Sequence, residues 1–324
     1  MVEQEMAEKN LILKVLAGSH AYGTQTPNSD HDYLGVFIPN EEYVLGYKVC
    51  EQVQIRTNSS GSKKQNTKDD TDTTIYALPK FIKLLQANNP TILETLYFHK
   101  KNILYCNRYG TRLLEAAPIF TSKKIKHTFL GYAFAQRKGL THKRERWMVI
   151  GEALRKLDDL EHQGQTMLPE RLHLHSELRE DGTWGNYEKG QLIVKVREQL
   201  QRELESYGYR IEDIKTHGFS CKFASHLIRL LNEGLELLVE GELTFPLRYN
   251  NLLRDIKMGK VPLDDILKIA DDLEHKVEDA YIKSSLPNTP DHAAIERLQI
   301  SMLKDYWNYK DPGIISRRLM RWGL

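Results

Sequence analysis

Two aspartates, Asp30 and Asp32, stand at the start of an apolar run, residues 33–38, that predicts a buried strand. Because successive strand residues point to opposite faces, both side chains are expected to project to the same side. Two carboxylates held together repel each other unless a cation lies between them, and oxygen ligands of this kind favour Mg²⁺ or Mn²⁺. The pair therefore predicts a metal site.

A Gly-Ser pair lies upstream of these acids. Gly18 and Ser19 follow the apolar run at residues 11–16, which predicts another buried strand. A flexible backbone and a hydroxyl are the groups that a polyphosphate needs beside such metals. Together with the acids, this pair predicts a nucleotidyl-transfer site.

The Asp-x-Asp pattern also has a plainer interpretation. Asn28, Ser29 and Asp30 all favour turns and caps, so the pattern alone is often only the exposed start of a strand. His31 lies between the two acids and is expected on the opposite strand face, as a packed histidine outside the site.

The order Gly18-Ser19, then Asp30-x-Asp32, then a later acidic strand residue resembles the nucleotidyltransferase signature of the DNA polymerase beta superfamily. More narrowly, the chain resembles the RNA-repair-pathway DNA polymerase beta (RlaP-like) family. The further segments that carry this resemblance are Asn88-Asn89-Pro90-Thr91-Ile92-Leu93-Glu94, Lys222-Phe223-Ala224-Ser225-His226-Leu227-Ile228-Arg229-Leu230-Leu231 and Phe245-Pro246-Leu247. It is weakest over residues 140–215.

The resemblance implies an α+β fold. A small mixed-sheet nucleotidyltransferase domain of the polymerase beta type is expected over residues 1–120, and a mainly helical domain over residues 121–324 is expected to close over nucleotide and acceptor. Apolar residues at helical spacing after residue 120 agree with this division.

The resemblance also implies a third acid, on a strand beside the Asp-x-Asp strand. The candidates are Asp69, Asp70 and Asp72, and we favour Asp72 because it directly precedes the strand-like run at residues 73–76. Asp72 would ligate a metal ion or act as general base, and Asp30 and Asp32 would bridge two Mg²⁺ or Mn²⁺ ions.

Lys222, His226 and Arg229 are spaced by four and three residues, which places them on one helix face. A solvated basic stripe is the default interpretation, but the helix is otherwise apolar, so these groups are expected to line a cleft. The resemblance implies that a helix of the second domain closes over the nucleotide. We therefore expect all three, with Gly18 and Ser19, to bind a nucleoside triphosphate.

Periodicity places the other elements. A strand or short helix is expected at residues 43–47, with a possible strand at 53–55, a mobile polar loop at 56–71, and a helix over 81–85 that stops at 88–90. Helical spacing is present over residues 125–137, 150–160, 192–207, 224–239, 263–282 and 292–307, whereas the pattern over 164–190 decides nothing.

Composition narrows the class of protein. Among 324 residues with 40% hydrophobic content there is no run of 18 or more apolar residues, and the acidic N-terminal stretch lacks the order of a signal peptide. We expect a cytoplasmic protein without a membrane partner. The 3 cysteines are far apart, which predicts neither disulfides nor a thiolate zinc site. A net charge of +2 means that any nucleic-acid surface must be a local patch.

The expected substrate is a nucleoside triphosphate, and the resemblance implies RNA as the acceptor, either a tRNA 3′ end or a repair intermediate. Candidate RNA-binding clusters are Lys123-Lys124-x-Lys126, residues 138–146 and Arg317-Arg318-x-x-Arg321. A solvated helix face or an interdomain contact is the alternative interpretation of each cluster, with at least equal weight. His173 and His175 have no third ligand at a suitable spacing, so a surface role is favoured over a metal site. The alternatives are a protein or small-molecule acceptor, a non-catalytic nucleotide- or RNA-binding module, and a helical scaffold. The sequence predicts no oligomeric state.

Overall fold

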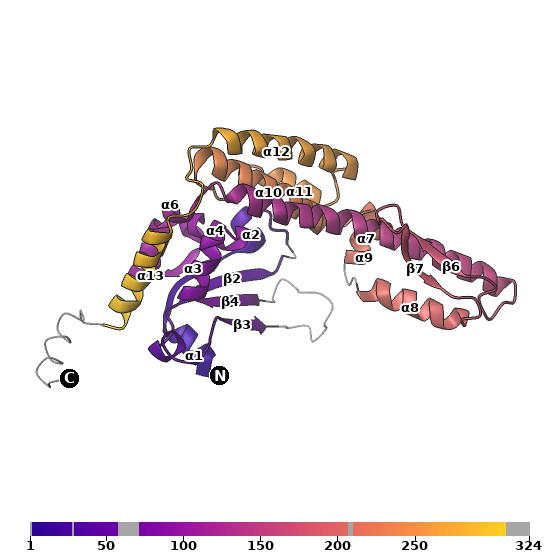
Figure 1. Ribbon diagram of the computed structural model, residues 1–324, viewed down its shortest axis with the longest axis horizontal. Coiled ribbons are helices and arrows are strands. Elements are labelled where there is room, and N and C mark those ends of the chain that lie inside the picture. The colour runs from indigo at the N-terminus through magenta and orange to yellow at the C-terminus, as the bar shows by residue number, and fades with distance from the viewer. Residues whose placement is uncertain (1, 28, 58–70, 207–209, 309–324) are drawn as a thin grey trace, which may run out of the picture.

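The structure, a computed structural model, describes residues 2–27, 29–57, 71–206 and 210–308. It confirms the α+β fold: a five-stranded mixed sheet is covered by helices and followed by a mainly helical region (Figure 1). The strand order is β3-β4-β2-β1-β5. The strands are β1 (Leu11–Leu16), β2 (His31–Phe37), β3 (Gln52–Thr57), β4 (Thr71–Ala77) and β5 (Ile103–Cys106).

The register of the sheet decides which side chains meet. β1 pairs antiparallel with β2 and β5, β3 pairs antiparallel with β4, and β2 runs parallel to β4 with Asp32 opposite Asp72. The last four residues of β2 are buried and the first three are only partly buried. The acids therefore lie where the strand leaves the core, and β2 and β4 are held in register by apolar side chains beyond them.

The predicted strands at residues 11–16, 33–38 and 73–76 are confirmed, and β4 begins earlier than expected, at Thr71. Residues 41–43 form a 3-10 turn, η1 (Glu41–Tyr43), and the possible strand at 53–55 is the centre of β3. Most of the polar stretch at 56–71 lies outside the described residues.

Helices surround the sheet and continue past it. Those of the N-terminal half are α1 (Val2–Lys9), α2 (Gly18–Tyr22), α3 (Leu78–Gln86), α4 (Pro90–Leu93), η2 (Glu94–Tyr97), η3 (Lys100–Asn102), α5 (Arg108–Glu115) and α6 (Ala117–Phe120). Those that follow are α7 (Ile125–His162), α8 (Ile193–Ser206), α9 (Arg210–His217), α10 (Cys221–Glu240), α11 (Asn250–Lys257), α12 (Leu263–Lys283) and α13 (His292–Tyr306).

One hydrophobic core runs from β1 and β2 through α3 into α7, α10, α12 and α13. α10 packs against α7, α11 and α12, and α13 returns to pack on α3 and α6 (Figure 1). The expected boundary near residue 120 therefore falls within a shared core, so the helices are fixed relative to the sheet by continuous apolar packing.

α7 is a single helix of 38 residues that includes both helical segments expected at 125–137 and 150–160. At 1.5 Å per residue it is about 57 Å long. Its C-terminal half extends beyond the sheet, and there it packs with the hairpin β6 (Leu172–His175) and β7 (Thr183–Tyr187) and with α8 around a second core (Figure 1). We call this part the arm. The hairpin accounts for the stretch that periodicity left undecided.

No helix within the described ranges combines the length and the apolar character needed to cross a bilayer.

The separate core of the arm leads to a stability prediction. Leu157 on α7 is fully buried in that core, so Leu157→Ala should cost the arm about 2 to 5 kcal/mol of local stability by opening a cavity. In amide hydrogen exchange, protection should fall in residues 163–206 and stay unchanged in β1, β2 and β4. Lys156→Ala is the matched control, because the Lys156 side chain is 55% exposed. An equal loss of protection in the sheet and the arm would contradict this division.

Candidate active site

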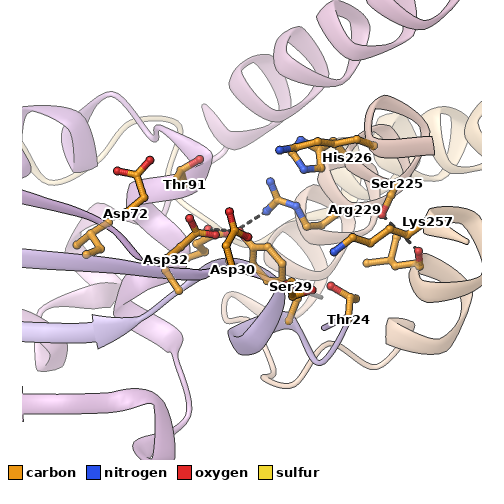
Figure 2. A pocket seen from close by; sticks show the side chains of 18 of the residues that line it. Thr24, Ser29, Asp30, Asp32, Asp72, Thr91, Ser225, His226, Arg229 and Lys257 are labelled. Carbon is orange, nitrogen blue, oxygen red and sulfur yellow. Dashed lines mark hydrogen bonds and ion pairs between the residues drawn. The ribbon is translucent and has the colours of Figure 1, made fainter. Parts of the chain in front are cut away.

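A cavity of about 760 Å³ lies between the sheet and helices α10 and α11. Figure 2 shows acids from the sheet on one side and His226, Arg229 and Lys257 on the other. The eight residues that the sequence singles out all line this cavity, namely Gly18, Ser19, Asp30, Asp32, Asp72, Lys222, His226 and Arg229. The structure thus brings together residues separated by more than two hundred positions, and their individual roles stay predictions.

Three carboxylates crowd the sheet side of the cavity. Asp30 directly precedes β2, Asp32 is within it, and Asp72 is the register partner of Asp32 on β4. Burial, Asp30 and Asp72 raise the pKa of Asp32 to about 6, although Lys222 and Lys257 oppose the rise. The carboxylates therefore repel one another more than the nearby lysines compensate.

The charge balance of the cavity fits a bound cation. Apart from the buried pair Glu94 and Arg229, described below, its lining has four aspartates and two lysines: Asp30, Asp32, Asp72, Asp213, Lys222 and Lys257. Within the described part of the chain, no group of three or more acidic, histidine or cysteine side chains is arranged so that it could hold a metal ion. The Arg56 guanidinium is 3.2 Å from Asp72. Mg²⁺ and Mn²⁺ prefer hard oxygen donors, and a metal ion at these aspartates stays a prediction.

Of the three candidates for the third acid, the structure describes Asp72. Asp69 and Asp70 lie outside the described residues, whereas Asp72 faces the cavity beside Asp32 (Figure 2). His31 stacks on His20 with ring centroids 4.4 Å apart and does not line the cavity. This position agrees with the expectation that His31 is a packing residue.

Gly18 and Ser19 begin the short helix α2, so they form a fixed turn rather than the flexible loop expected. Gly18 has a φ of +59°, and a Cβ there would collide with the Asp32 carboxylate. The amide of Ala17 donates to the Asp32 carbonyl at 2.8 Å, and that of Thr24 donates to the Ser19 carbonyl at 2.9 Å. Glycine is therefore required because the turn lies directly against the acidic strand.

Lys257 is a residue that sequence reasoning missed. It is the last residue of α11, lines the cavity and is close enough to Asp30 and Asp32 to be influenced by both. Burial and the charge of Lys222 lower its pKa, while the two aspartates oppose this change. The sequence has no second residue at a regular spacing from Lys257 that would mark it as part of a site. Its one sequence clue is that it follows the Phe245-Pro246-Leu247 segment, which carries the family resemblance. Two lysines opposite the acids can hold phosphate groups.

Arg229 is part of a buried ion cluster. Its Nη1 donates to Glu94 Oε2 at 2.7 Å and to both Glu233 carboxylate oxygens at 2.9 Å. The guanidinium lies 4.6 Å from the ring centroid of Tyr22, whose hydroxyl donates to Glu94 Oε1 at 2.6 Å. Two protein carboxyl groups thus already bind the guanidinium of Arg229, and its contact with nucleotide stays a prediction.

This cluster joins two segments that carry the family resemblance. Glu94 ends the segment at residues 88–94, and Arg229 lies in the segment at 222–231. The side chains of Glu94 and Glu233 are at most 1% exposed, so removing Arg229 would leave buried carboxylates without a counter-charge, at a cost of about 3 to 5 kcal/mol. The cluster therefore holds α10 in place over the sheet.

The structure describes two of the three basic clusters, at residues 123–126 and 138–146, and their contacts with RNA stay predictions. Lys126 pairs with Glu278 at 2.8 Å, and Lys123 and Lys126 both lie over the ring of Tyr281. The cluster at 123–126 thus packs α7 against α12. Arg317, Arg318 and Arg321 lie outside the described residues. The run at residues 138–146 lies in the middle of α7, where the arm begins.

The buried cluster predicts a pH dependence of stability. Burial raises the pKa of Glu233 to about 8, with Glu94 and Glu236 adding to the rise and Arg229 opposing it; Tyr22 and Tyr249 also face the cluster. The folded protein thus keeps a proton that the unfolded chain loses near pH 4.5, so the contribution of Glu233 to stability is full below that pH and is lost as the pH rises toward 8.

Glu233→Gln should remove part of this fall, which urea unfolding at pH 5, 6, 7 and 8 would measure. Glu240→Gln is the control on the same helix, because its carboxylate is exposed beside Arg248. Equal pH slopes in the wild type and Glu233→Gln would contradict the assignment.

The chain is similar to known proteins in sequence and, more weakly, in structure. The model of the RlaP family, described as the RNA repair pathway DNA polymerase beta family, matches residues 2–299. An uncharacterized 38.9 kDa protein from the nrdC-mobD intergenic region of Enterobacteria phage T4 is 25% identical over 310 residues, which cover 85% of this chain and 90% of that protein. A crystal structure of a nucleotidyltransferase-like protein from Exiguobacterium sibiricum aligns over 95% of this chain and 76% of that chain, with 10% identity and a TM-score of 0.26.

Proposed function

Because the chain belongs to the RNA repair pathway DNA polymerase beta family, we propose that it is a metal-dependent nucleotidyltransferase. It moves a nucleoside monophosphate from a nucleoside triphosphate to an acceptor hydroxyl and releases pyrophosphate. One observation carries the proposal: three carboxylates from adjacent strands, a glycine turn and two lysines from helices converge on one cavity.

The proposed reaction is an in-line displacement. The acceptor oxygen forms a bond to the α-phosphorus, the bond from that phosphorus to the bridging oxygen breaks, and the hydroxyl proton passes to a base such as Asp72. Mg²⁺ or Mn²⁺ held by Asp30, Asp32 and Asp72 would neutralise phosphate charge and favour ionisation of the hydroxyl. Catalysis then depends mainly on positioning and charge neutralisation.

The triphosphate would lie between the turn and the helices. The backbone N–H groups and hydroxyl of Gly18-Ser19 would contact the β- and γ-phosphates, and Lys222 and Lys257 would balance their charge from the opposite side. His226 lines the same side of the cavity and would contact the base or sugar. Arg229 would act mainly by holding α10 in position.

We propose RNA as the acceptor, in agreement with the family description. The test is to incubate the protein with each α-labelled nucleoside triphosphate, Mg²⁺, and either total RNA or total protein. Label on RNA would support the proposal. Label only on protein or on a small molecule would overturn the RNA acceptor, and no transfer with any acceptor would overturn the enzymatic function.

The acidic residues give the first activity prediction. Asp30→Asn, Asp32→Asn and Asp72→Asn should each lower transfer by about a hundredfold or more, because each removes a charged ligand or base. The melting temperature of the metal-free protein should be unchanged or slightly higher for Asp30→Asn and Asp32→Asn, because repulsion between carboxylates is relieved. Asp272→Asn on α12, whose side chain is 61% exposed, is the control. Near-normal transfer by Asp30→Asn or Asp32→Asn would remove the proposed mechanism.

The two lysines that line the catalytic cavity give the second activity prediction. Lys222→Ala and Lys257→Ala should each weaken binding of nucleoside triphosphate by about ten- to a hundredfold, because a charge-assisted contact contributes about 1.5 to 3 kcal/mol. Ser19→Ala should have a smaller effect. Titration calorimetry would measure the Kd. Lys260→Ala is the matched control, since Lys260 pairs with Asp255 at 3.2 Å and does not line the cavity. An unchanged Kd for Lys257→Ala would assign this lysine to packing.

A further inference from the structure

A second cavity of about 370 Å³ lies where the arm begins. It is lined by His142, Lys143 and Arg146 of α7, Trp184 of β7 and Glu203 of α8. The reaction proposed above uses none of these residues. The cavity combines cationic and aromatic side chains, so its chemistry differs from that of the acidic catalytic cavity.

The walls of the arm cavity are fixed by contacts within the protein. Arg146 is buried and donates from Nε and Nη2 to the two oxygens of Glu203, at 2.7 and 2.6 Å. This pair joins α7 to α8. The cavity is thus a built feature, held on both sides by a bidentate ion pair.

The Trp184 ring is also held in place. Its Nε1 donates to Glu145 Oε2 at 2.7 Å, and the amide of Leu178 donates to Glu145 Oε1 at 3.1 Å. The ring of His142 meets it edge to face at 5.7 Å, and Arg179 places its guanidinium carbon 5.1 Å from the ring centroid. The ring is thereby fixed before any ligand binds, with the guanidinium groups of Arg146 and Arg179 over it and the Glu145 carboxylate at its Nε1.

The two cavities lie on helices that pack against each other. Lys143 of α7 lines the arm cavity, and its Nζ lies 4.6 Å from the centroid of the Phe223 ring on α10. Phe223 is next in sequence to Lys222, which lines the catalytic cavity. Cationic and aromatic side chains thus lie together at the arm cavity and where α7 packs on α10. This combination is typical of surfaces that bind single-stranded nucleic acid, where cations contact phosphates and rings stack on bases.

We propose that the arm cavity is a second subsite for the acceptor strand. It binds a nucleotide of single-stranded RNA upstream of the 3′ end, with the base against Trp184 and the phosphate beside Lys143. This inference rests on the proposed RNA acceptor. A small-molecule acceptor would occupy only the catalytic cavity, so the arm cavity predicts that binding depends on the length of the strand.

The test compares RNA of two lengths. Fluorescence anisotropy measures the Kd of labelled single-stranded RNA of two and of about twelve nucleotides, for the full-length wild type, Lys143→Gln and Trp184→Leu. Trp184→Phe is included because it keeps an aromatic ring, so it still tests the site in case Trp184→Leu destabilises the arm. Lys156→Gln is the matched control, because Lys156 lies on the same helix, pairs with Glu152 at 2.9 Å and does not line the cavity.

We expect Trp184→Leu to weaken binding of the longer RNA about tenfold or more, and Trp184→Phe to weaken it less. Lys143→Gln should weaken it several-fold and reduce the slope of log K against log salt by about 0.7. Neither variant should change the Kd for the dinucleotide or for nucleoside triphosphate. The control should match the wild type.

Two results would overturn the inference: equal affinity of the wild type and the variants for the longer RNA, or the same loss for both lengths. The binding test needs no transfer, so it is separate from the test of the proposed function. Transfer of label to RNA without any effect of the arm variants would overturn the arm subsite alone. Binding that depends on Trp184 without transfer to RNA would support the subsite and overturn the acceptor reaction.

Discussion

The contact on which the site depends most is the buried cluster of Arg229, Glu94 and Glu233. One guanidinium is held by two carboxylates at 2.7 to 2.9 Å, with almost no access to water. Such a cluster gives little net stability, because burying charge is costly, but it permits only an arrangement that keeps every charge matched. α10 cannot slide by a turn over the sheet without leaving a charge buried alone. The position of Lys222 and His226 on the same helix is fixed as a result.

With the helix fixed, the cavity keeps opposite charges apart. The acids lie at the N-terminal ends of β2 and β4, and the lysines lie at the start of α10 and the end of α11. Burial is the largest cause of the raised pKa of Asp32, and repulsion from Asp30 and Asp72 adds to it while Lys222 and Lys257 oppose it. The cavity thus presents negative charge on its sheet side and positive charge on its helix side. In the proposed function, the metal ions of a bound triphosphate would face the acids and its phosphate groups would face the lysines.

Local patterns in the sequence predicted where the acids lie in the fold, whereas long-range contacts could not be predicted; the roles of the acids stay predictions. Asp30 and Asp32 follow from the two-residue period of a strand, and the apolar surroundings of the helix indicated that its polar residues line a cleft. The partner of Arg229, Glu94, lies 135 residues away and carries no local signal. α7 resembled two helices because residues 138–149 are mostly polar, yet they contain no proline to end a helix. The hairpin of the arm was missed because its strands are only four and five residues long.

The length of α7 has a mechanical consequence for the proposed acceptor. The helix packs on α10 beside the catalytic cavity and then continues without a break into the arm. The two cavities are therefore connected by a rigid element rather than by a flexible linker. A strand bound in both would gain affinity only if its length matches the fixed separation, since a second contact on the same molecule is useful only when both can be made together. A rigid arm would thus select acceptors by the reach of their unpaired 3′ end, without contacts that distinguish one base from another.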